Sequence, residues 1–243
     1  MIKLNCDMGE SFGIWKMGED ELIMPYINMA NLACGFHSSD SITMSKSVQL
    51  AVKHNITIGA HPSYQDLVGF GRRSMNCSSD EISAIIIYQL GALNGFCKVY
   101  DTEVSYIKPH GALYNDMMKD ENIYKAILKA ISSFDKNIKL MILSTPNHEE
   151  FEKIASSYGV ELIYEVFADR NYNDDGSLVS RSESNAVVHD ENEVIQRVEL
   201  LANDGYISSI NGNKLFINAD TICVHGDGQN ALSFIKALKK VLN

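Results

Sequence analysis

The chain has 243 residues, of which 45% are hydrophobic, and a formal net charge of -10. This length can bury the core of one α/β barrel, and the acidic balance argues against nucleic acid as a partner, because phosphates need a basic surface. No apolar run approaches the roughly 18 residues of a membrane span, and the first residues show no signal-peptide core. The five cysteines form no paired metal spacing, so we expect reduced thiols in a cytoplasmic protein.

Short apolar runs alternate with helical patterns along the chain. Strands are predicted at residues 2–5, 29–33, 57–60, 104–107, 139–143, 161–164 and 221–224. Helices are predicted at residues 20–26, 40–54, 79–100, 120–134, 147–158, 191–203 and 229–242. Ser38, Ser39 and Asp40 are N-cap candidates for the second of these helices, and Ser78 with Glu81 has the pattern of a capping box. The polar stretch 171–184 is the longest irregular segment and a candidate to close over a site.

This alternation, with short connections, predicts a mainly parallel sheet with right-handed crossovers. The first interpretation is a distorted or incomplete (β/α) barrel with about seven parallel strands, and an open doubly wound sheet is the alternative. No linker, repeat or low-complexity tract divides the sequence. We therefore predict a single domain spanning residues 1–243.

Four of the seven histidines stand where a predicted strand gives way to a loop: His37, His61, His110 and His225. In a barrel of parallel strands, these strand ends converge on one rim, where such folds carry their chemistry. A single histidine at a strand end is more often structural than functional. Four of them at equivalent positions favour a functional site.

Other polar residues near the same strand ends extend this set. They are Asp7, Glu10, Asp40, Arg72, Arg73, Lys108, Glu165, Asp169, Arg170 and Asp227. Two kinds of chemistry fit them. Asp7, His37 and His61 could bind a divalent metal ion, because imidazole and carboxylate suit zinc, manganese or iron. Alternatively, histidines and carboxylates act as general acids and bases, while cationic residues such as Lys108 stabilise negative charge or hold a phosphate or carboxylate.

Each assignment has a structural alternative. Arg72 and Arg73 could anchor their loop through ion pairs. Glu165, Asp169 and Arg170 could form an internal ion-pair network that holds the rim. The strand-end cysteines could serve as catalytic thiols, although a small buried side chain is the usual role of such residues.

Several motifs are absent from the sequence. The sequence contains no GxxxxGK[ST] segment, so a P-loop nucleotide site is not predicted. The segment from Gly69 to Gly71 lacks the third glycine of a dinucleotide fingerprint. The GxSxG nucleophile elbow is also missing, so a serine hydrolase of that type is not predicted.

Six blocks of sequence, in order along the chain, resemble the signature blocks of the LamB/YcsF family. They are NCDMGESFG (5–13), ACGFH (33–37), GAHPS with GFGRR (59–73), KPHGALYN (108–115), EVFADR (165–170) and VHGD (224–227). The sequence departs from the family pattern at residues 38–41, at Gln65 and at residues 228–230. None of these departures removes a histidine or a charged side chain, so they affect the expected loop shape rather than the expected chemistry.

The resemblance implies a barrel related to the glycoside hydrolase/deacetylase superfamily. Members of the family are the A subunits of bacterial ATP-dependent 5-oxoprolinases, which implies cleavage of 5-oxo-L-proline to L-glutamate with ATP hydrolysis. It further implies ATP as co-substrate, 5-oxoprolinase subunits B and C as partners, and a divalent metal that is either Mg²⁺ with ATP or a site ion.

For this chemistry we assign catalytic roles to Asp7, His61, Lys108, His110, Glu165 and Asp169. Substrate-binding roles are assigned to Glu10, His37, Arg72, Arg73, Arg170, His225 and Asp227. Two other functions stay open. One is a metal-dependent amidohydrolase or deacetylase that works alone, and the other is a non-catalytic scaffold subunit of a hydrolase complex.

Overall fold

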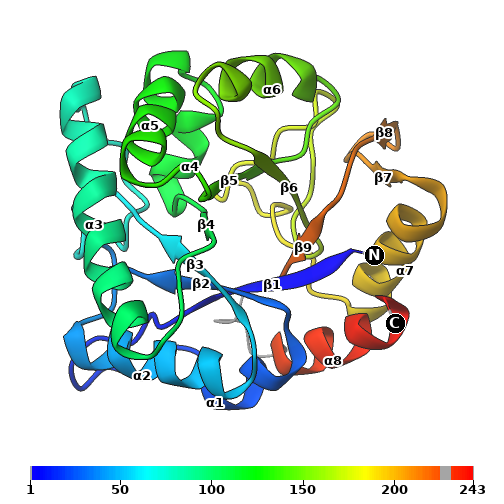
Figure 1. Cartoon of the computed structure of the whole chain (residues 1–243). Coiled ribbons are helices and arrows are strands. Elements are labelled where there is room, and N and C mark those ends of the chain that lie inside the picture. Colours follow the sequence, from blue (N-terminus) through cyan, green and yellow to red (C-terminus); the bar gives the residue numbers. More distant parts are fainter. Residues whose placement is uncertain (1, 225–230, 243) are drawn as a thin grey trace.

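A computed structural model describes residues 2–224 and 231–242 of the chain. Seven parallel strands form a closed barrel in the order β1-β2-β3-β4-β5-β6-β9 (Figure 1). They are β1 (Lys3–Met8), β2 (Met29–Ala33), β3 (Thr57–His61), β4 (Tyr106–Ile107), β5 (Lys139–Leu143), β6 (Leu162–Phe167) and β9 (Thr221–Cys223). The prediction of a seven-stranded (β/α) barrel is confirmed, and the closed barrel rules out the open doubly wound sheet. It is incomplete only in having one strand fewer than the eight-stranded form.

Helices surround the ring of strands (Figure 1). They are α1 (Asp20–Ile23), α2 (Ser41–Lys53), α3 (Ser79–Val99), α4 (Gly111–Met117), α5 (Glu121–Phe134), α6 (His148–Ser157), α7 (Glu191–Asp204) and α8 (Ala231–Leu242), with a 3₁₀ turn at Met24–Tyr26. Strands β7 (Tyr206–Ser208) and β8 (Lys214–Phe216) form an antiparallel pair that is separate from the barrel.

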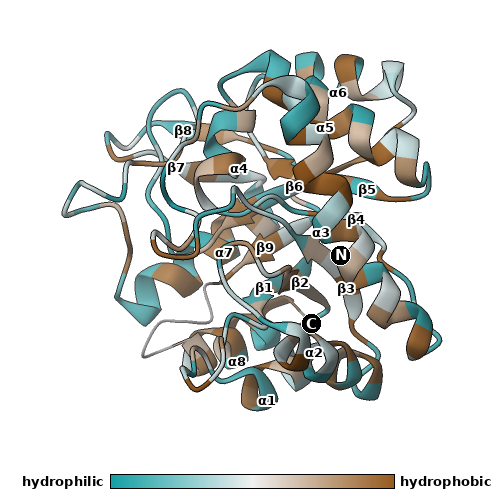
Figure 2. Ribbon diagram, turned by 90° about the vertical axis from the view of Figure 1, so that its left-hand side faces the viewer, coloured by the Kyte–Doolittle hydropathy of each residue, from teal (hydrophilic) through white to brown (hydrophobic). Residues whose placement is uncertain are grey.

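Side chains along each barrel strand alternate between the surrounding helices and the barrel interior. On β1 the even-numbered residues pack into the core between strands and helices, whereas Asn5 and Asp7 bond to a side chain of the neighbouring strand β2. A separate apolar layer inside the barrel consists of Met29, Tyr106 and Met141. Figure 2 shows the apolar strands as brown ribbons at the centre of the molecule, with teal stretches in the outer loops.

Gly59 on β3 makes room for the largest side chain of that inner layer. A β-carbon at this position would lie 2.2 Å from the ring of Tyr106, a distance that no packed structure tolerates. The missing side chain therefore lets the tyrosine ring lie across the interior, where it takes part in the polar network described below.

Three barrel strands extend further at their C-terminal ends than the sequence predicts, β1 and β6 by three residues each and β3 by one. Because β1 continues to Met8 and β6 to Phe167, Asp7 and Glu165 lie in strands and not in the loops expected for them. Polar partners inside the barrel allow these charged residues to occupy inward-facing strand positions.

The predicted helix starts agree with the observed caps. Asp40 Oδ1 accepts hydrogen bonds from the backbone N–H groups of Ile42 and Thr43 at 2.8 and 3.0 Å, and Ser78 with Glu81 forms the predicted capping box. Helix α4 and the β7–β8 pair were not predicted. The described part of α8 begins at Ala231, so its predicted start at residue 229 lies outside the described residues.

Helix α3 is the one helix of the described chain that is long and apolar enough to cross a membrane, although the sequence shows no uninterrupted apolar run of that length. It packs against α5 and buries Ile82, Ile86, Leu90 and Leu93. The core helix of a folded domain has the same composition, so we interpret α3 as part of the barrel wall.

Candidate functional site

Polar side chains from distant parts of the sequence meet at the C-terminal ends of the barrel strands. Asp7 and Glu165 lie near the ends of β1 and β6, His61 ends β3, and Lys108 and His110 follow β4. Barrels of parallel strands carry their active sites at this end. The structure thus gathers five of the predicted catalytic residues in one place.

Three histidines and a glutamate form the first part of the site, which we call the imidazole cluster: Glu10, His37, His61 and His110. Each residue contributes one potential ligand atom, and these atoms lie within 4.8 Å of one another. His110 Nδ1 is 2.9 Å from His61 Nε2, and His37 Nε2 is 3.4 Å from Glu10 Oε1. The rings of His37 and His110 stack with their centroids 3.8 Å apart. This group could hold a metal ion.

The second ring nitrogen of each histidine contacts an atom outside the cluster. These contacts join His61 Nδ1 to Lys108 O at 2.7 Å, His110 Nε2 to Phe70 O at 2.9 Å, and His37 Nδ1 to Ser63 Oγ at 3.1 Å. Such outer contacts fix the orientation and the tautomer of an imidazole ring.

Gly71 lets the loop after β3 pack directly against two of these rings. Its φ is 63°, and a β-carbon there would lie 2.8 Å from His37 Cβ and 2.9 Å from His110 Cδ2. Another residue would be strained by its backbone conformation and would displace the imidazoles.

Burial lowers the pKa of His37 and His110 well below the usual range, and the neighbouring imidazoles lower it further. Both side chains are almost completely inaccessible to water. We therefore expect both rings to be neutral in the folded protein near neutral pH.

The second part of the site, which we call the charge cluster, consists of Asp7, Lys108, Glu165 and Cys223. Lys108 Nζ lies 3.0 Å from Asp7 Oδ1, 2.8 Å from Glu165 Oε1 and 3.2 Å from Cys223 Sγ. Burial alone lowers the pKa of Lys108, but the opposite charges around it outweigh burial and raise the pKa well above its usual value. Tyr114 donates a hydrogen bond of 3.0 Å to the other oxygen of Glu165.

The Lys108 ammonium group therefore donates hydrogen bonds to Asp7 and Cys223 and forms an ion pair with Glu165. Lys108 is 2% exposed, and its charge is matched by two carboxylates. This geometry suits a residue that positions Asp7 and Glu165, and it differs from the predicted role of binding an anionic group. Burial raises the pKa of Cys223 well above its usual value, so this residue remains a thiol.

A chain of hydrogen bonds across the barrel interior fixes the orientation of the Asp7 carboxylate. Tyr106 donates to Asn31 Oδ1 at 2.7 Å, and Asn31 Nδ2 donates to Asp7 Oδ1 and to Asn5 Oδ1, both at 2.8 Å. Asn5 Nδ2 in turn donates to Thr221 Oγ1 at 2.9 Å. This network was not predicted, although two amide side chains at inward-facing positions of predicted strands were a signal for it.

Several predicted site residues lie outside these two clusters. Arg73 is exposed and forms a bidentate ion pair with Asp66, which fits the alternative of a loop anchor. The Arg72 guanidinium lies 5.0 Å from the centroid of the Phe70 ring. His225 and Asp227 fall outside the described residues.

Arg170 holds the polar segment that follows β6. Its guanidinium group donates to the backbone carbonyls of Ala186 at 3.1 Å and Val179 at 2.6 Å. Asp169 is buried next to it, and its carbonyl accepts a hydrogen bond from Val188 N at 2.9 Å. Glu165, by contrast, pairs with Lys108. The predicted network of Glu165, Asp169 and Arg170 is thus divided between the barrel interior and the rim.

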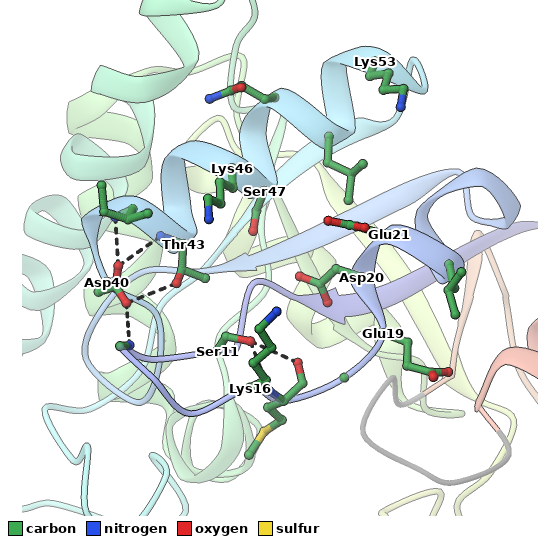
Figure 3. A pocket seen from close by; sticks show the side chains of 17 residues that line it. Ser11, Lys16, Glu19, Asp20, Glu21, Asp40, Thr43, Lys46, Ser47 and Lys53 are labelled. Atoms are coloured by element: carbon green, nitrogen blue, oxygen red, sulfur yellow. Dashed lines mark hydrogen bonds between the residues drawn. The ribbon is translucent and has the colours of Figure 1, made fainter.

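A cavity of about 1000 Å³ lies between the segment 11–22 and α2 (Figure 3). No residue of either cluster lines it. Asp20, which does line it, accepts a hydrogen bond of 2.9 Å from Gly9 N, and burial raises the pKa of Asp20 to about 6. The cavity therefore adjoins the backbone segment that carries Glu10.

A closed ring of parallel strands with a buried polar site at its C-terminal end defines a (β/α)-barrel protein with the architecture of an enzyme. A glycoside hydrolase family 5 enzyme from Prevotella bryantii B14 has a similar fold, with a TM-score of 0.50, 9% identity, and coverage of 100% of this chain and 96% of that chain. The LamB/YcsF family model matches residues 2–243. The chain belongs to the LamB/YcsF family.

Named relatives match almost the whole chain. A protein of Vibrio vulnificus (strain YJ016), named as the A subunit of 5-oxoprolinase, is 50% identical over 241 residues, which cover 99% of this chain and 97% of that protein. A Pseudomonas aeruginosa protein, named as A subunit 3 of 5-oxoprolinase, is 46% identical over 100% of this chain and 96% of its own length. The crystal structure of the lactam utilization protein from Thermus thermophilus has a TM-score of 0.91 and 36% identity, over 99% of this chain and 95% of that one.

Proposed function

We propose that the chain is the A subunit of an ATP-dependent 5-oxoprolinase, which opens the lactam ring of 5-oxo-L-proline to give L-glutamate while ATP is hydrolysed. The observation that carries this proposal is the similarity over the whole length to relatives named as the A subunit of 5-oxoprolinase. A buried site with a carboxylate, a lysine and three histidines at the barrel mouth is consistent with hydrolysis of an amide.

In this proposal, ATP phosphorylates the lactam oxygen, because resonance stabilises the ring amide and makes it a poor electrophile. ADP leaves, the ring N–H proton is released, and the ring becomes an O-phosphorylated imidate. A water molecule then adds to the ring carbon, while Asp7 accepts one of its protons and passes it to the ring nitrogen. As the C–N bond breaks, the hydroxyl of the tetrahedral adduct becomes a carbonyl and its proton passes through Asp7 to the departing nitrogen. The resulting γ-glutamyl phosphate reacts with a second water to give L-glutamate and phosphate.

Asp7 suits the role of the base because its two oxygens have different surroundings. Oδ1 is held by Lys108 and Asn31, whereas Oδ2 lies 3.3 Å from His61 Nε2, on the side of the imidazole cluster. The Asp7 side chain is 11% exposed, so water can reach it. Lys108 and Glu165 then act as positioning residues.

The other assignments are retained as part of the proposal. His61 and His110 border the reaction centre, and Asp169 lies at its rim. Glu10, His37, Arg72, Arg73, Arg170, His225 and Asp227 are the residues proposed to bind the substrate and its phosphate. A guanidinium group can hold a carboxylate or phosphate through two hydrogen bonds. To do so, Arg73 would have to release Asp66, and Arg170 would have to release the backbone carbonyls of Ala186 and Val179.

We propose ATP as the co-substrate and 5-oxoprolinase subunits B and C as the partner chains. The sequence has no P-loop motif, so partner chains that take part in the ATP-dependent step are consistent with it. A divalent cation completes the proposed set of cofactors, either as Mg²⁺ on the phosphates of ATP or as an ion in the imidazole cluster. A cytoplasmic location fits the supply of ATP and the reduced cysteines.

The experiment that tests this function measures glutamate formation from 5-oxoproline and ATP by the chain alone and by the chain mixed with subunits B and C. We expect activity in the mixture only, and a loss of about 100-fold or more in Asp7→Asn, because the base is removed. Asp101→Asn, a change at an exposed aspartate, is the matched control and should retain activity.

Two outcomes would point to the alternatives. Full activity of the mixture with Asp7→Asn would indicate a scaffold subunit whose partners perform the chemistry. Amide or acetyl hydrolysis by the chain alone, without ATP, would indicate an amidohydrolase or deacetylase that works independently.

A further inference from the structure

The hydrogen-bond pattern of the imidazole cluster determines which ring nitrogens carry hydrogen. His61 Nδ1 lies 2.7 Å from the backbone carbonyl of Lys108, and a carbonyl oxygen can only accept a hydrogen bond. The Nδ1 atom therefore carries the hydrogen. In the neutral ring, Nε2 then presents a lone pair, and this atom faces the cluster.

The same argument applies to His110, and it creates a conflict. His110 Nε2 lies 2.9 Å from the carbonyl of Phe70, so Nε2 donates and Nδ1 presents the lone pair. That Nδ1 atom is 2.9 Å from His61 Nε2. Two lone pairs at this distance repel each other unless a positive charge lies close to both.

His37 presents a third lone pair. Its Nδ1 atom lies 3.1 Å from Ser63 Oγ, and the single hydroxyl hydrogen of Ser63 is donated to the carbonyl of Tyr64 at 2.8 Å. His37 Nδ1 must therefore be the donor. His37 Nε2 is buried without a hydrogen-bond partner among the described residues, and it faces the carboxylate of Glu10 at 3.4 Å.

Added protons would relieve the repulsion between these lone pairs less well than a single metal cation. One proton could bridge His61 and His110, and a second could sit between His37 and Glu10. The two positive imidazoles would then adjoin each other inside the protein, since the rings of His37 and His110 are stacked 3.8 Å apart. One divalent ion near the convergence of the lone pairs interacts with all of them.

We propose that Glu10, His37, His61 and His110 bind a divalent transition-metal ion, with zinc the best match to three imidazoles and one carboxylate. The partners of the outer nitrogens, two backbone carbonyls and Ser63, are the contacts that metal-binding histidines commonly have. The role of the ion in turnover rests on the proposed function. There it would supply a Lewis acid next to Asp7.

This ligand set differs from the predicted one of Asp7, His37 and His61. Asp7 Oδ1 is already occupied by Lys108 and Asn31, and Asp7 Oδ2 adjoins one imidazole of the cluster, that of His61. Glu10 lies close to two, those of His37 and His110. The carboxylate ligand therefore comes from the loop after β1 rather than from β1 itself.

The test measures metal content and affinity without any substrate. The chelator-stripped chain is titrated with Zn²⁺ and separately with Mg²⁺, followed by calorimetry and by elemental analysis after gel filtration. We expect about one equivalent of zinc, no retained magnesium, and a rise of several degrees in the melting temperature on zinc binding. His37→Gln and His110→Gln should each weaken zinc binding by about 100-fold or more.

Matched changes distinguish coordination from a general effect on folding. His189→Gln alters an exposed histidine outside the site and should leave zinc affinity unchanged. Ser63→Ala removes the acceptor of His37 Nδ1 but no ligand, and should weaken affinity by about tenfold while circular dichroism stays unchanged.

Failure to retain zinc, manganese or iron(II) in the wild-type chain would overturn the metal site, as would unchanged affinity in both folded glutamine variants. Because no substrate is used, this result is independent of the proposed oxoprolinase activity. Zinc retained by a chain that lacks that activity, even with its partners, would overturn the proposed function and leave the metal site in place.

Discussion

The charge cluster and the imidazole cluster are neighbours at the barrel mouth, joined by the 3.3 Å contact between Asp7 Oδ2 and His61 Nε2. In the charge cluster, the ammonium group of Lys108 has three acceptors around it, two of them carboxylates. In the imidazole cluster, three nitrogen lone pairs face one another and a carboxylate. The charge cluster has its counter-charges within the fold, whereas the imidazole cluster is the site where we propose that a cation binds from solution.

Because of this difference, substitutions in the two clusters should affect different properties, folding in one and ligand binding in the other. A substitution in the charge cluster leaves a buried charge without its counter-charge, so folding should suffer together with activity. A substitution of His37 or His110 in the imidazole cluster should mainly reduce ligand binding, because burial keeps these two rings neutral. Stability and metal affinity, measured on the same variants, can therefore test the comparison directly.

The largest effect is expected for Lys108→Met. It removes the ammonium group between Asp7 and Glu165 and leaves two carboxylates buried together. We expect a loss of about 3–5 kcal/mol in the free energy of unfolding and loss of oxoprolinase activity. Urea denaturation followed by circular dichroism measures the first effect, and glutamate formation measures the second.

A matched lysine provides the control for this prediction. Lys139 pairs with Glu161 on the surface, with 46% and 74% of their side chains exposed, so Lys139→Met should change stability by about 1 kcal/mol at most. Adding Glu165→Gln to Lys108→Met should recover part of the lost stability. Equal effects of the two lysine substitutions would show that the charge cluster does not stabilise the fold.

A smaller effect is expected for Asn31→Ala, which removes the amide between Tyr106 and Asp7. The Tyr106 hydroxyl and Asn5 Oδ1 lose their partners, so we expect about 1–3 kcal/mol of destabilisation. The Asp7 carboxylate loses one donor, and the acidic limb of the pH–rate profile should move to higher pH. Tyr106→Phe keeps the amide and should leave that limb unchanged. A profile that does not move in Asn31→Ala would argue against a positioning role.

Much of the fold could be predicted because each barrel strand and most helices carry a local signal. The run from Thr57 to His61 ends before Pro62, and Ser78 with Glu81 marks the start of α3. Strand ends in the barrel interior were less predictable. Asp7 and Glu165 resemble loop residues in the sequence, and only pairing with Lys108 across the barrel makes them compatible with strands.

The sequence predicted where the polar strand-end residues gather, but not which of them contact one another. Strand-end histidines identified the rim, since topology alone brings such ends together. Which carboxylate faces which imidazole depends on side-chain direction and loop path. Glu10, rather than Asp7, adjoins His37 because β1 ends at Met8 and Gly9 turns the chain with a φ of 71°. No spacing in the sequence encodes that turn.

The neutral state of the buried His37 and His110 rings predicts how stability depends on pH. Because burial lowers the pKa of His37 and His110, the unfolded chain binds more protons than the folded chain below about pH 6.5. Stability of the metal-stripped protein should fall with decreasing pH there, by up to about 1.4 kcal/mol per pH unit for each ring. Urea titrations of wild type and His37→Gln, with His189→Gln as control, measure this slope. An equal slope in all three would contradict the prediction.

The smallest effect tests the region beside the site, where Asp20 lines the cavity of Figure 3. Burial raises the pKa of its carboxyl group from 3.8 to about 6, so the folded chain binds more protons than the unfolded chain between these values. The stabilising contribution of the protonated form is lost as the pH rises through about 6.

Asn at this position can still accept the hydrogen bond from Gly9 N and carries no charge. We therefore expect Asp20→Asn to gain about 1 kcal/mol of stability near pH 8 and nothing near pH 4. Glu19→Gln, at an exposed position next to it, should gain nothing at either pH, and a pH-independent effect of Asp20→Asn would assign the gain to packing instead of to the buried charge.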